Sequence, residues 1–128
     1  MKIAIVIYDD FSLLNLAKLS NFLNKFDNLN IKICAFKNEI KSKFGICIKP
    51  DIFNESLDGF DCVMVCDGNI DKMVSNDIFL SWIRSSCLAK YKISFGNAYE
   101  ILKASKFENF TNFADFNKNN IENLLHLK

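Results

Sequence analysis

A strand that turns sharply into a helix is the segment of this chain with the clearest chemical potential. Residues 92–95 form a mainly apolar stretch, Gly96 follows, and residues 97–104 give a helical run. In α/β enzymes such a turn often carries a nucleophile, because it lies at the carboxyl edge of a parallel sheet and against a helix N-terminus. Here the apex is glycine, which has no side chain to attack a substrate. The segment therefore indicates a scaffold more clearly than a reaction.

A thiol at the end of another apolar run is the second candidate. Cys66 follows residues 62–65 and is expected at the carboxyl edge of the sheet, near the turn at Gly96. As a hypothesis, it is a displaced nucleophile. Three acidic side chains could adjust its proton affinity, namely Asp67, Asp115 and Glu100. The alternative, which we favour, is that Cys66 belongs to a buried strand and is core, since a free cysteine behaves as a small hydrophobe.

The backbone of the same turn has a shape that suits an anion. We expect the N–H groups near Gly96, Asn97 and Ala98 to point outward at a helix N-terminus, where partial positive charge favours a carboxylate or phosphate. Binding of a small carbonyl or carboxylate compound without turnover is consistent with this pattern. Glu100 fits a solvated position on the following helix. The acidic pair at residues 9–10 fits helix caps better than catalytic acids.

Composition bounds the classes of function. The chain has 128 residues, half of them apolar, with a net charge of +1, so we expect a single domain over 1–128. Arg84 is the only arginine, no basic stripe is present, and no helix-turn-helix segment follows the domain, so nucleic acid is not an expected partner. No apolar stretch is long enough for a membrane span or a signal peptide.

Cysteine and histidine usage points to a reducing compartment and away from a metal site. The cysteines are odd in number and lie mostly within apolar runs, at Cys34, Cys47, Cys62, Cys66 and Cys87. This pattern favours buried thiols in the cytoplasm over a disulfide framework. There is no Cys-x-x-Cys pair, and the only histidine is His126, so neither a metal nor a cofactor is expected.

Strand and helix patterns alternate along the chain. Apolar runs predict buried strands at residues 3–7, 31–36, 62–66 and 93–95. Apolar residues at three- and four-residue spacing predict helices over 11–26, 78–87 and 97–105 and a short one after 120. Residues 44–50 suggest a hairpin arm or edge strand, and 52–57 a short helix. The predicted fold is α/β, with a mostly parallel sheet flanked by helices.

Four segments, in order, carry a family resemblance. They are residues 8–17 (YDDFSLLNLA), 45–51 (GICIKPD), 60–68 (FDCVMVCDG) and 82–102, from Trp82 through the turn at Gly96. Together they resemble the ThiJ/PfpI family, and this resemblance implies a flavodoxin-like or class I glutamine amidotransferase-like fold. The nearest likeness is to the isonitrile-hydratase-like subgroup, which also includes N-terminal domains of AraC-type regulators. The resemblance covers roughly residues 2–116.

The sequence departs from the family pattern at the positions where the family has its reactive residues. The resemblance implies a nucleophilic cysteine where Gly96 stands, an acidic residue where Asn15 stands and a histidine where Asp115 stands. Of a terminal Gly-Gly pair that helps form an oxyanion hole, only Gly68 remains, with Asp67 beside it. The chain also ends before the family's closing elements, so we expect a fold that is truncated at the C-terminus.

Each substitution keeps shape and removes reactivity. Glycine accepts positive φ without strain, and the Asn15 amide can hydrogen-bond but has no titratable proton. We therefore expect a non-catalytic ThiJ/PfpI-like domain that serves as a small-molecule binding or protein-interaction module. The ligand-binding candidates are Gly68, Gly96, Asn97, Asn15, Asp67 and Glu100. An enzyme of hydrolase, hydratase or glyoxalase type built on Cys66 is the alternative, and a degenerate structural remnant is the third. A truncated fold also predicts an uncovered apolar face and a homodimer, with a complex in which another chain supplies the missing part as the alternative.

Overall fold

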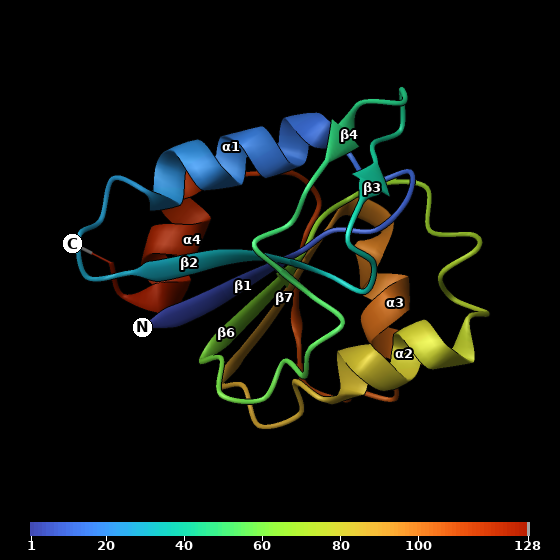
Figure 1. The fold of residues 1–128 in the computed structure, drawn as a ribbon. Helices are drawn as coiled ribbons and strands as arrows, with labels where there is room; N and C mark the ends of the chain where they lie inside the picture. The colour runs from blue at the N-terminus through green and yellow to red at the C-terminus, as the bar shows by residue number, and fades with distance from the viewer. Residues whose placement is uncertain (128) are drawn as a thin grey trace.

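Six parallel strands form the centre of the structure, and helices cover both faces of the sheet (Figure 1). The computed structural model describes residues 1–127. The strands of this sheet are β1 (Lys2–Val6), β2 (Asn30–Ala35), β5 (Ile52–Phe53), β6 (Cys62–Val65), β7 (Tyr91–Phe95) and β8 (Thr111–Phe113). The helices are α1 (Leu13–Leu23), α2 (Asp77–Arg84), the 3₁₀ turn η1 (Gly96–Ala98), α3 (Tyr99–Ala104) and α4 (Lys118–Leu125). The predicted α/β fold with a mostly parallel sheet is confirmed.

The apolar runs become the central strands because both of their faces are covered. All four residues of β6 are buried, as are the last four of β1. The two strands pair in parallel from Ile3 opposite Cys62 to Val6 opposite Val65. A strand with two covered faces needs a continuous apolar sequence, which is why the alternation typical of one-sided sheets is missing here.

The order of the strands reverses direction at one point. The sheet runs β5-β2-β1-β6-β7-β8. From β1 the chain moves outward to β2 and β5, and from β6 it moves outward in the opposite direction to β7 and β8. The chain therefore continues from β1 and from β6 to helices on opposite faces, α1 and α2, and the carboxyl edge at such a reversal is the usual ligand position in open α/β sheets.

The helices divide between the two faces of the sheet (Figure 1). Helices α1 and α4 lie on one side, where Phe22 of α1 meets Phe116 just before α4 with ring centroids 5.9 Å apart. Helices α2 and α3 lie on the other side. Phe116 is the last of four phenylalanines spaced by three, and the whole series packs half-buried against the core: Phe107, Phe110, Phe113 and Phe116.

The start of α1 differs from the prediction. Ser12, and neither Asp9 nor Asp10, is the N-cap, and its hydroxyl accepts a hydrogen bond from the N–H of Asn15 (3.2 Å). Asp10 has a positive φ of 73°. The Asp9 carboxylate turns toward the next loop instead, where it accepts hydrogen bonds from the Lys37 ammonium and the Lys41 N–H. Both aspartates belong to the loop that brings the chain from the sheet to the helix.

Two further elements differ from the prediction. Residues 52–57 do not form a helix, because residues 52–53 form β5, which pairs in parallel with the end of β2. Asp51 fixes this pairing, since its carboxylate accepts from the Ile33 N–H (2.8 Å) and its own N–H donates to the Ile33 carbonyl (2.9 Å). Strand β8 was not predicted, because three residues are too few to give a periodic signal.

The predicted hairpin arm at residues 44–50 is present. It forms a separate antiparallel pair of two short strands, β3 (Ile40–Lys41) and β4 (Cys47–Ile48). Phe44 at its tip is 89% exposed and Ile46 is 51% exposed. The hairpin therefore presents apolar side chains to solvent beside the carboxyl edge of the sheet.

Candidate functional site

The turn at Gly96 that joins β7 to α3, which we call the elbow, lies at the carboxyl edge of the sheet, in the region where the strand order reverses. Gly96 directly follows β7, and Asp67 and Gly68 lie just beyond β6. Ser12 and Asn15 enter the same region from the start of α1. Loops that are far apart in sequence thus meet where α/β proteins commonly hold a ligand.

Gly96 adopts the backbone conformation that the sequence predicted. Its φ is +58°, which glycine accepts freely and which costs other residues about 1–3 kcal/mol. Steric crowding is a second reason for glycine at this position. A Cβ atom placed on Gly96 would lie 2.5 Å from each carboxylate oxygen of Asp67. The space that a nucleophilic side chain would use is therefore already occupied.

The Asp67 carboxylate occupies that space as an internal anion. Its Oδ1 accepts hydrogen bonds from the N–H of Asn97 (3.1 Å) and from the N–H of Gly68 (2.8 Å). The Asn97 N–H is one of the backbone donors that we predicted from the sequence to bind an external carboxylate or phosphate. In the structure the chain supplies the carboxylate itself.

The backbone of Asp67 is held from the first helix. Its N–H donates to the Asn15 side-chain carbonyl (2.9 Å), and its carbonyl accepts from the Ser12 N–H (2.6 Å). Asn15 is buried, with 6% of its surface exposed. An amide carbonyl here satisfies the backbone donor without adding a second charge near the Asp67 carboxylate. Asn15 is therefore a positioning residue for Asp67.

The three positions where the resemblance implies catalytic residues come close together. A cavity of about 50 Å³ lies beside the elbow and is lined by Ser12, Leu14, Asn15, Lys18, Asp67, Phe95 and Asp115. Gly96 follows Phe95 directly. Asp115 is exposed, and its carboxylate accepts from the N–H of Phe116 (2.7 Å). The remaining space has about the volume of a water-sized site and is far smaller than a typical ligand pocket.

The other ligand-binding candidates lie around this cavity without lining it. Asn97 contributes its backbone N–H, while Glu100 is exposed on α3, as expected for a solvated position. Gly68 has a packing reason to be glycine. A Cβ there would lie 2.6 Å from both the Asp10 carbonyl oxygen and the Phe11 Cα. The loop after β1 thus lies directly against the loop after β6.

Cys66 is enclosed in the core. It is 0% exposed, and burial, with a smaller contribution from the charge of Asp67, raises the pKa of its thiol well above the ordinary value. The Tyr8 hydroxyl donates to the Cys66 carbonyl oxygen (2.5 Å), and burial also raises the pKa of Tyr8. A thiol that stays protonated and lacks access is a poor nucleophile. Its surroundings therefore favour the core interpretation.

The other cysteines divide into two groups. Cys34 and Cys62 are buried, and burial raises the pKa of the Cys34 thiol to about 12. Cys47 and Cys87 are exposed, which corrects the expectation that buried thiols account for the set as a whole. All five are free thiols.

Sequence reasoning missed two features of this edge. Asp67 was expected to adjust a thiol or to bind a ligand, and its role as an acceptor on the elbow was not foreseen. The signal was present, because an acidic side chain follows one strand and an unpaired helix N-terminus follows its neighbour. The second feature is a larger cavity of about 200 Å³ near the ends of β1 and β2. Its lining combines four loops or elements, so no single motif marks it.

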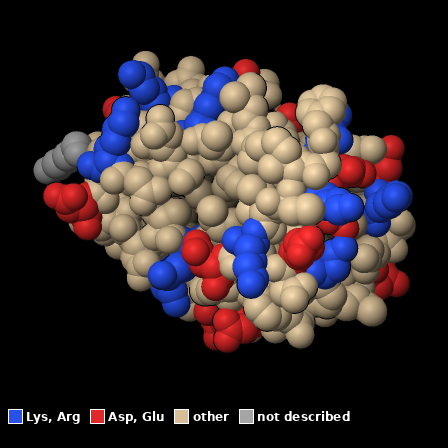
Figure 2. Space-filling model, turned by 45° about the horizontal axis from the view of Figure 1, so that its top comes forward, with Lys and Arg blue, Asp and Glu red and all other residues tan. Residues whose placement is uncertain are grey.

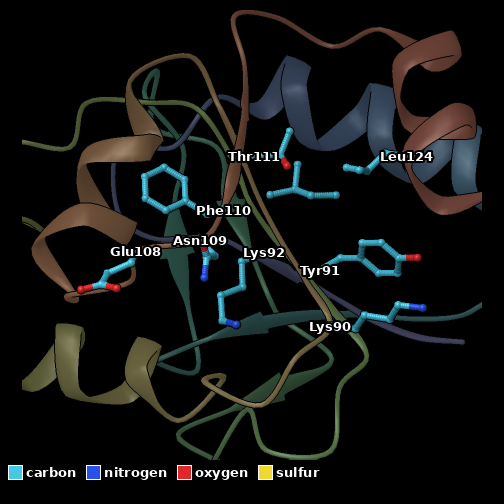
Figure 3. A pocket seen from close by; sticks show the side chains of 9 residues that line it. Lys90, Tyr91, Lys92, Glu108, Asn109, Phe110, Thr111 and Leu124 are labelled. Atoms are coloured by element: carbon cyan, nitrogen blue, oxygen red, sulfur yellow. The ribbon is translucent and has the colours of Figure 1, made fainter.

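A cavity of about 390 Å³ lies away from the elbow, near the start of β7 (Figure 3). Lys90, Lys92 and Glu108 line it together with aromatic and small polar residues. Figure 3 shows that the charged ends of these three side chains point in different directions and do not converge. The Lys92 ammonium is already engaged, since it donates to the Ala89 carbonyl (3.0 Å). This cavity is large enough for a ligand, but its charged side chains do not converge on a common point where they could bind one.

Charged side chains are interleaved on the surface. On the face in Figure 2, Lys and Arg side chains stand close to Asp and Glu side chains around a broad uncharged area. This distribution matches the net charge of +1. Within residues 1–127, no helix is both long and apolar enough to cross a membrane.

Comparisons with known proteins agree with the fold. No protein-family model and no curated protein matches the chain. Among solved structures, a ThiJ/PfpI family protein from Pseudomonas syringae is 20% identical with a TM-score of 0.73, covering 81% of this chain and 45% of its own. A DJ-1 superfamily protein from Agrobacterium tumefaciens is 16% identical with a TM-score of 0.66, covering 83% of this chain and 58% of its own.

A third solved structure matches nearly end to end. An AraC family transcriptional regulator from Pseudomonas putida is 13% identical with a TM-score of 0.72, covering 99% of this chain and 92% of its own. The chain thus has the fold of the ThiJ/PfpI and DJ-1 superfamily proteins, and the predicted resemblance is confirmed at the level of the fold. It spans about half the length of the ThiJ/PfpI and DJ-1 structures named above. The isonitrile-hydratase-like subgroup stays a prediction.

Proposed function

We propose that this chain is a non-catalytic domain with the ThiJ/PfpI and DJ-1 fold that serves as a binding module for a small molecule or a protein partner. The observation that carries the proposal is the Asp67 carboxylate on the elbow. It accepts the Asn97 N–H and fills the space beside Gly96. An enzyme would need both a nucleophile and a free oxyanion donor at this point.

The surroundings of the elbow support the same conclusion. Asn15 supplies an amide where a proton-transfer residue would be acidic, and its carbonyl is used to hold the Asp67 backbone. Cys66, which directly precedes Asp67, is fully buried and its thiol has a raised pKa. A hydrolase, hydratase or glyoxalase mechanism based on Cys66 would need the core around β6 to open.

The test is alkylation of the native protein with iodoacetamide, read for each cysteine by mass spectrometry over a range of pH. We expect Cys47 and Cys87 to react, because they are exposed, and Cys66 to stay protected until the protein unfolds. The two exposed cysteines are the internal control for reagent activity. Fast modification of Cys66 well below the reference thiol pKa of about 8.5 would instead support the relocated enzyme.

Self-association is a second part of the proposal. Several large apolar side chains are exposed, at Phe44, Leu88, Ile78 and Leu14. These side chains are available for contact with a partner, and we propose a second copy of the chain as the simplest one. We expect a homodimer in sedimentation velocity at micromolar concentration, and a stable monomer at that concentration would contradict it. Cytoplasmic localisation, proposed from the five free thiols, would be checked by cell fractionation.

A further inference from the structure

We propose that the cavity at the carboxyl ends of β1 and β2 binds a small neutral aromatic amide or carbonyl compound. The cavity lies apart from the elbow and has a volume of about 200 Å³. Nine residues line it, namely Ile7, Tyr8, Asp9, Phe36, Lys37, Ile40, Met73, Asn76 and Phe79. This inference rests on the proposed function, since it gives the binding module a site and a class of ligand.

The walls of the cavity are apolar and aromatic. Ile7, Tyr8, Ile40 and Phe79 are almost completely buried, and the Tyr8 and Phe79 rings meet edge to face with centroids 6.2 Å apart. The Tyr8 hydroxyl is directed to the Cys66 carbonyl, so the ring and not the hydroxyl is available to the cavity. An apolar space of roughly 150 Å³ is enough for a benzene ring. The walls therefore suit one aromatic ring with a small substituent.

The polar residues of the cavity are the more exposed ones, and they define its mouth. The side chains of Asp9 and Lys37 are 39% and 57% exposed and form an ion pair. The Asn76 carbonyl caps α2 by accepting the Phe79 N–H (3.1 Å), which leaves the Asn76 amide group free to donate to a ligand. The Lys37 ammonium has three donors and gives one of them to Asp9.

The balance of charge at the mouth selects a neutral polar group. Asp9 and Lys37 cancel, so the mouth offers donors from Lys37 and Asn76 and an acceptor from Asp9 without net charge. A primary amide complements this set, because its carbonyl accepts and its NH₂ group donates. A carboxylate in the same place would face the Asp9 carboxylate and would be disfavoured.

The position of the cavity supports a role in binding. It is formed by the segments that follow β1 and β2 and by the segment that leads into α2. These lie at the carboxyl edge of the sheet, next to the point where the strand order reverses. Trp82, the only tryptophan, packs against Phe36 and Phe79 of the cavity wall, with ring centroids 6.1 and 5.8 Å apart. Its fluorescence is therefore a direct reporter of the site.

The experiment is a titration of the full chain with benzamide, followed by Trp82 fluorescence and by ¹H–¹⁵N amide shifts. We expect saturable binding, with the largest shifts at Lys37, Met73 and Asn76. Benzoate, which replaces the amide by a carboxylate, should bind at least about threefold more weakly, and acetamide, which lacks the ring, at least about tenfold more weakly. These probes separate the ring from the polar group.

Two variants and one control locate the binding. Met73→Phe adds a ring at a half-buried wall position and should weaken benzamide binding at least about tenfold, while Leu88→Phe adds the same ring at a position that is 83% exposed and should leave it unchanged. Lys37→Ala removes a surface donor with little risk to folding and should weaken benzamide at least about threefold.

Three results would overturn the inference: no saturable response to benzamide, equal affinity in Met73→Phe and the native chain, or shifts confined to Asp67 and Asn97 at the elbow. The proposed function would fail in a different way, through rapid alkylation of Cys66. The two failures can therefore be told apart.

Discussion

The elbow and the cavity near β1 and β2 lie at the same edge of one sheet, yet they are occupied in opposite ways. At the elbow, the Asp67 carboxylate lies on the Asn97 N–H and leaves a space of about 50 Å³. In the cavity, the neighbouring carboxylate of Asp9 is drawn to Lys37 at the mouth, and about 200 Å³ stays open behind it.

The difference shows how the partner of a loop carboxylate decides whether a site stays open. Asp67 has backbone donors within reach and no cation in its hydrogen bonds, so it turns inward onto the elbow. Asp9 has a lysine beside it and turns outward. The elbow, which has the shape of a catalytic site, is therefore filled by a side chain of the protein itself. The cavity near β1 and β2 lacks that shape but keeps room for a ligand.

Replacing Gly96 should give the largest effect at the elbow. In Gly96→Ala the new Cβ would displace the Asp67 carboxylate, whose short side chain can move only by giving up its hydrogen bonds to Asn97 and Gly68. Backbone strain of about 1–3 kcal/mol adds to a loss of similar size for the charged hydrogen bonds. We expect the free energy of unfolding, measured by urea denaturation, to fall by about 3–5 kcal/mol.

Gly59 provides a matched control for that change. It also has a positive φ, +90°, but a Cβ there would meet nothing within 4 Å. Gly59→Ala should therefore show the backbone strain alone. If the two variants lose the same stability, Asp67 does not crowd the elbow. If crowding is the cause, adding Asp67→Ala to Gly96→Ala should cost less than the sum of the single changes.

The ion pair at the mouth of the cavity should give the smallest effect. Burial raises the pKa of Asp9, but the hydrogen bonds from Lys37 and Lys41 and their charges outweigh it and lower the pKa overall. A lowered folded pKa means that the stabilisation is complete above the unfolded value of about 3.9 and is lost as the pH falls through the folded pKa. Both side chains are well exposed, so the pair contributes at most about 1 kcal/mol.

Thermal unfolding of Lys37→Ala tests this small effect. The variant should be slightly less stable than the native chain near neutral pH, and the difference should disappear as the pH is lowered below about 4. Lys49→Ala, a change at another exposed lysine, is the control. A difference that grows on acidification would contradict the lowered pKa of Asp9.

Much of the fold could be predicted from the sequence because its signals are local. The continuous apolar runs of β1 and β6 and the glycine at the elbow each specify one strand or one turn. The elements that were predicted wrongly depend on contacts between residues far apart in the sequence. Residues 52–53 form a strand by pairing with the edge of β2, and the Asp9 carboxylate bonds to a lysine in another loop while Ser12 caps α1.

The sequence could predict which residues lie at the candidate site, but not which contacts their side chains make there. Asn15 and Asp115 line one cavity together with Phe95, the residue directly before Gly96. What each side chain does there depends on rotamers and partners in three loops, which no spacing in the sequence encodes. The direction of the Asp67 carboxylate is the example: the sequence places an acid beside a helix N-terminus but does not say that it turns inward.

The most direct test of the internal anion is the response of the Asn97 amide to acetate. In the native chain, the ¹H–¹⁵N signal of Asn97 should not move when acetate is added, because Asp67 holds the N–H. In Asp67→Ala the donor is released, and acetate should produce a saturable shift of the same signal, with chloride at equal ionic strength as the control. A saturable acetate shift in the native chain would contradict the account, since it would mean that the elbow is open to an external anion.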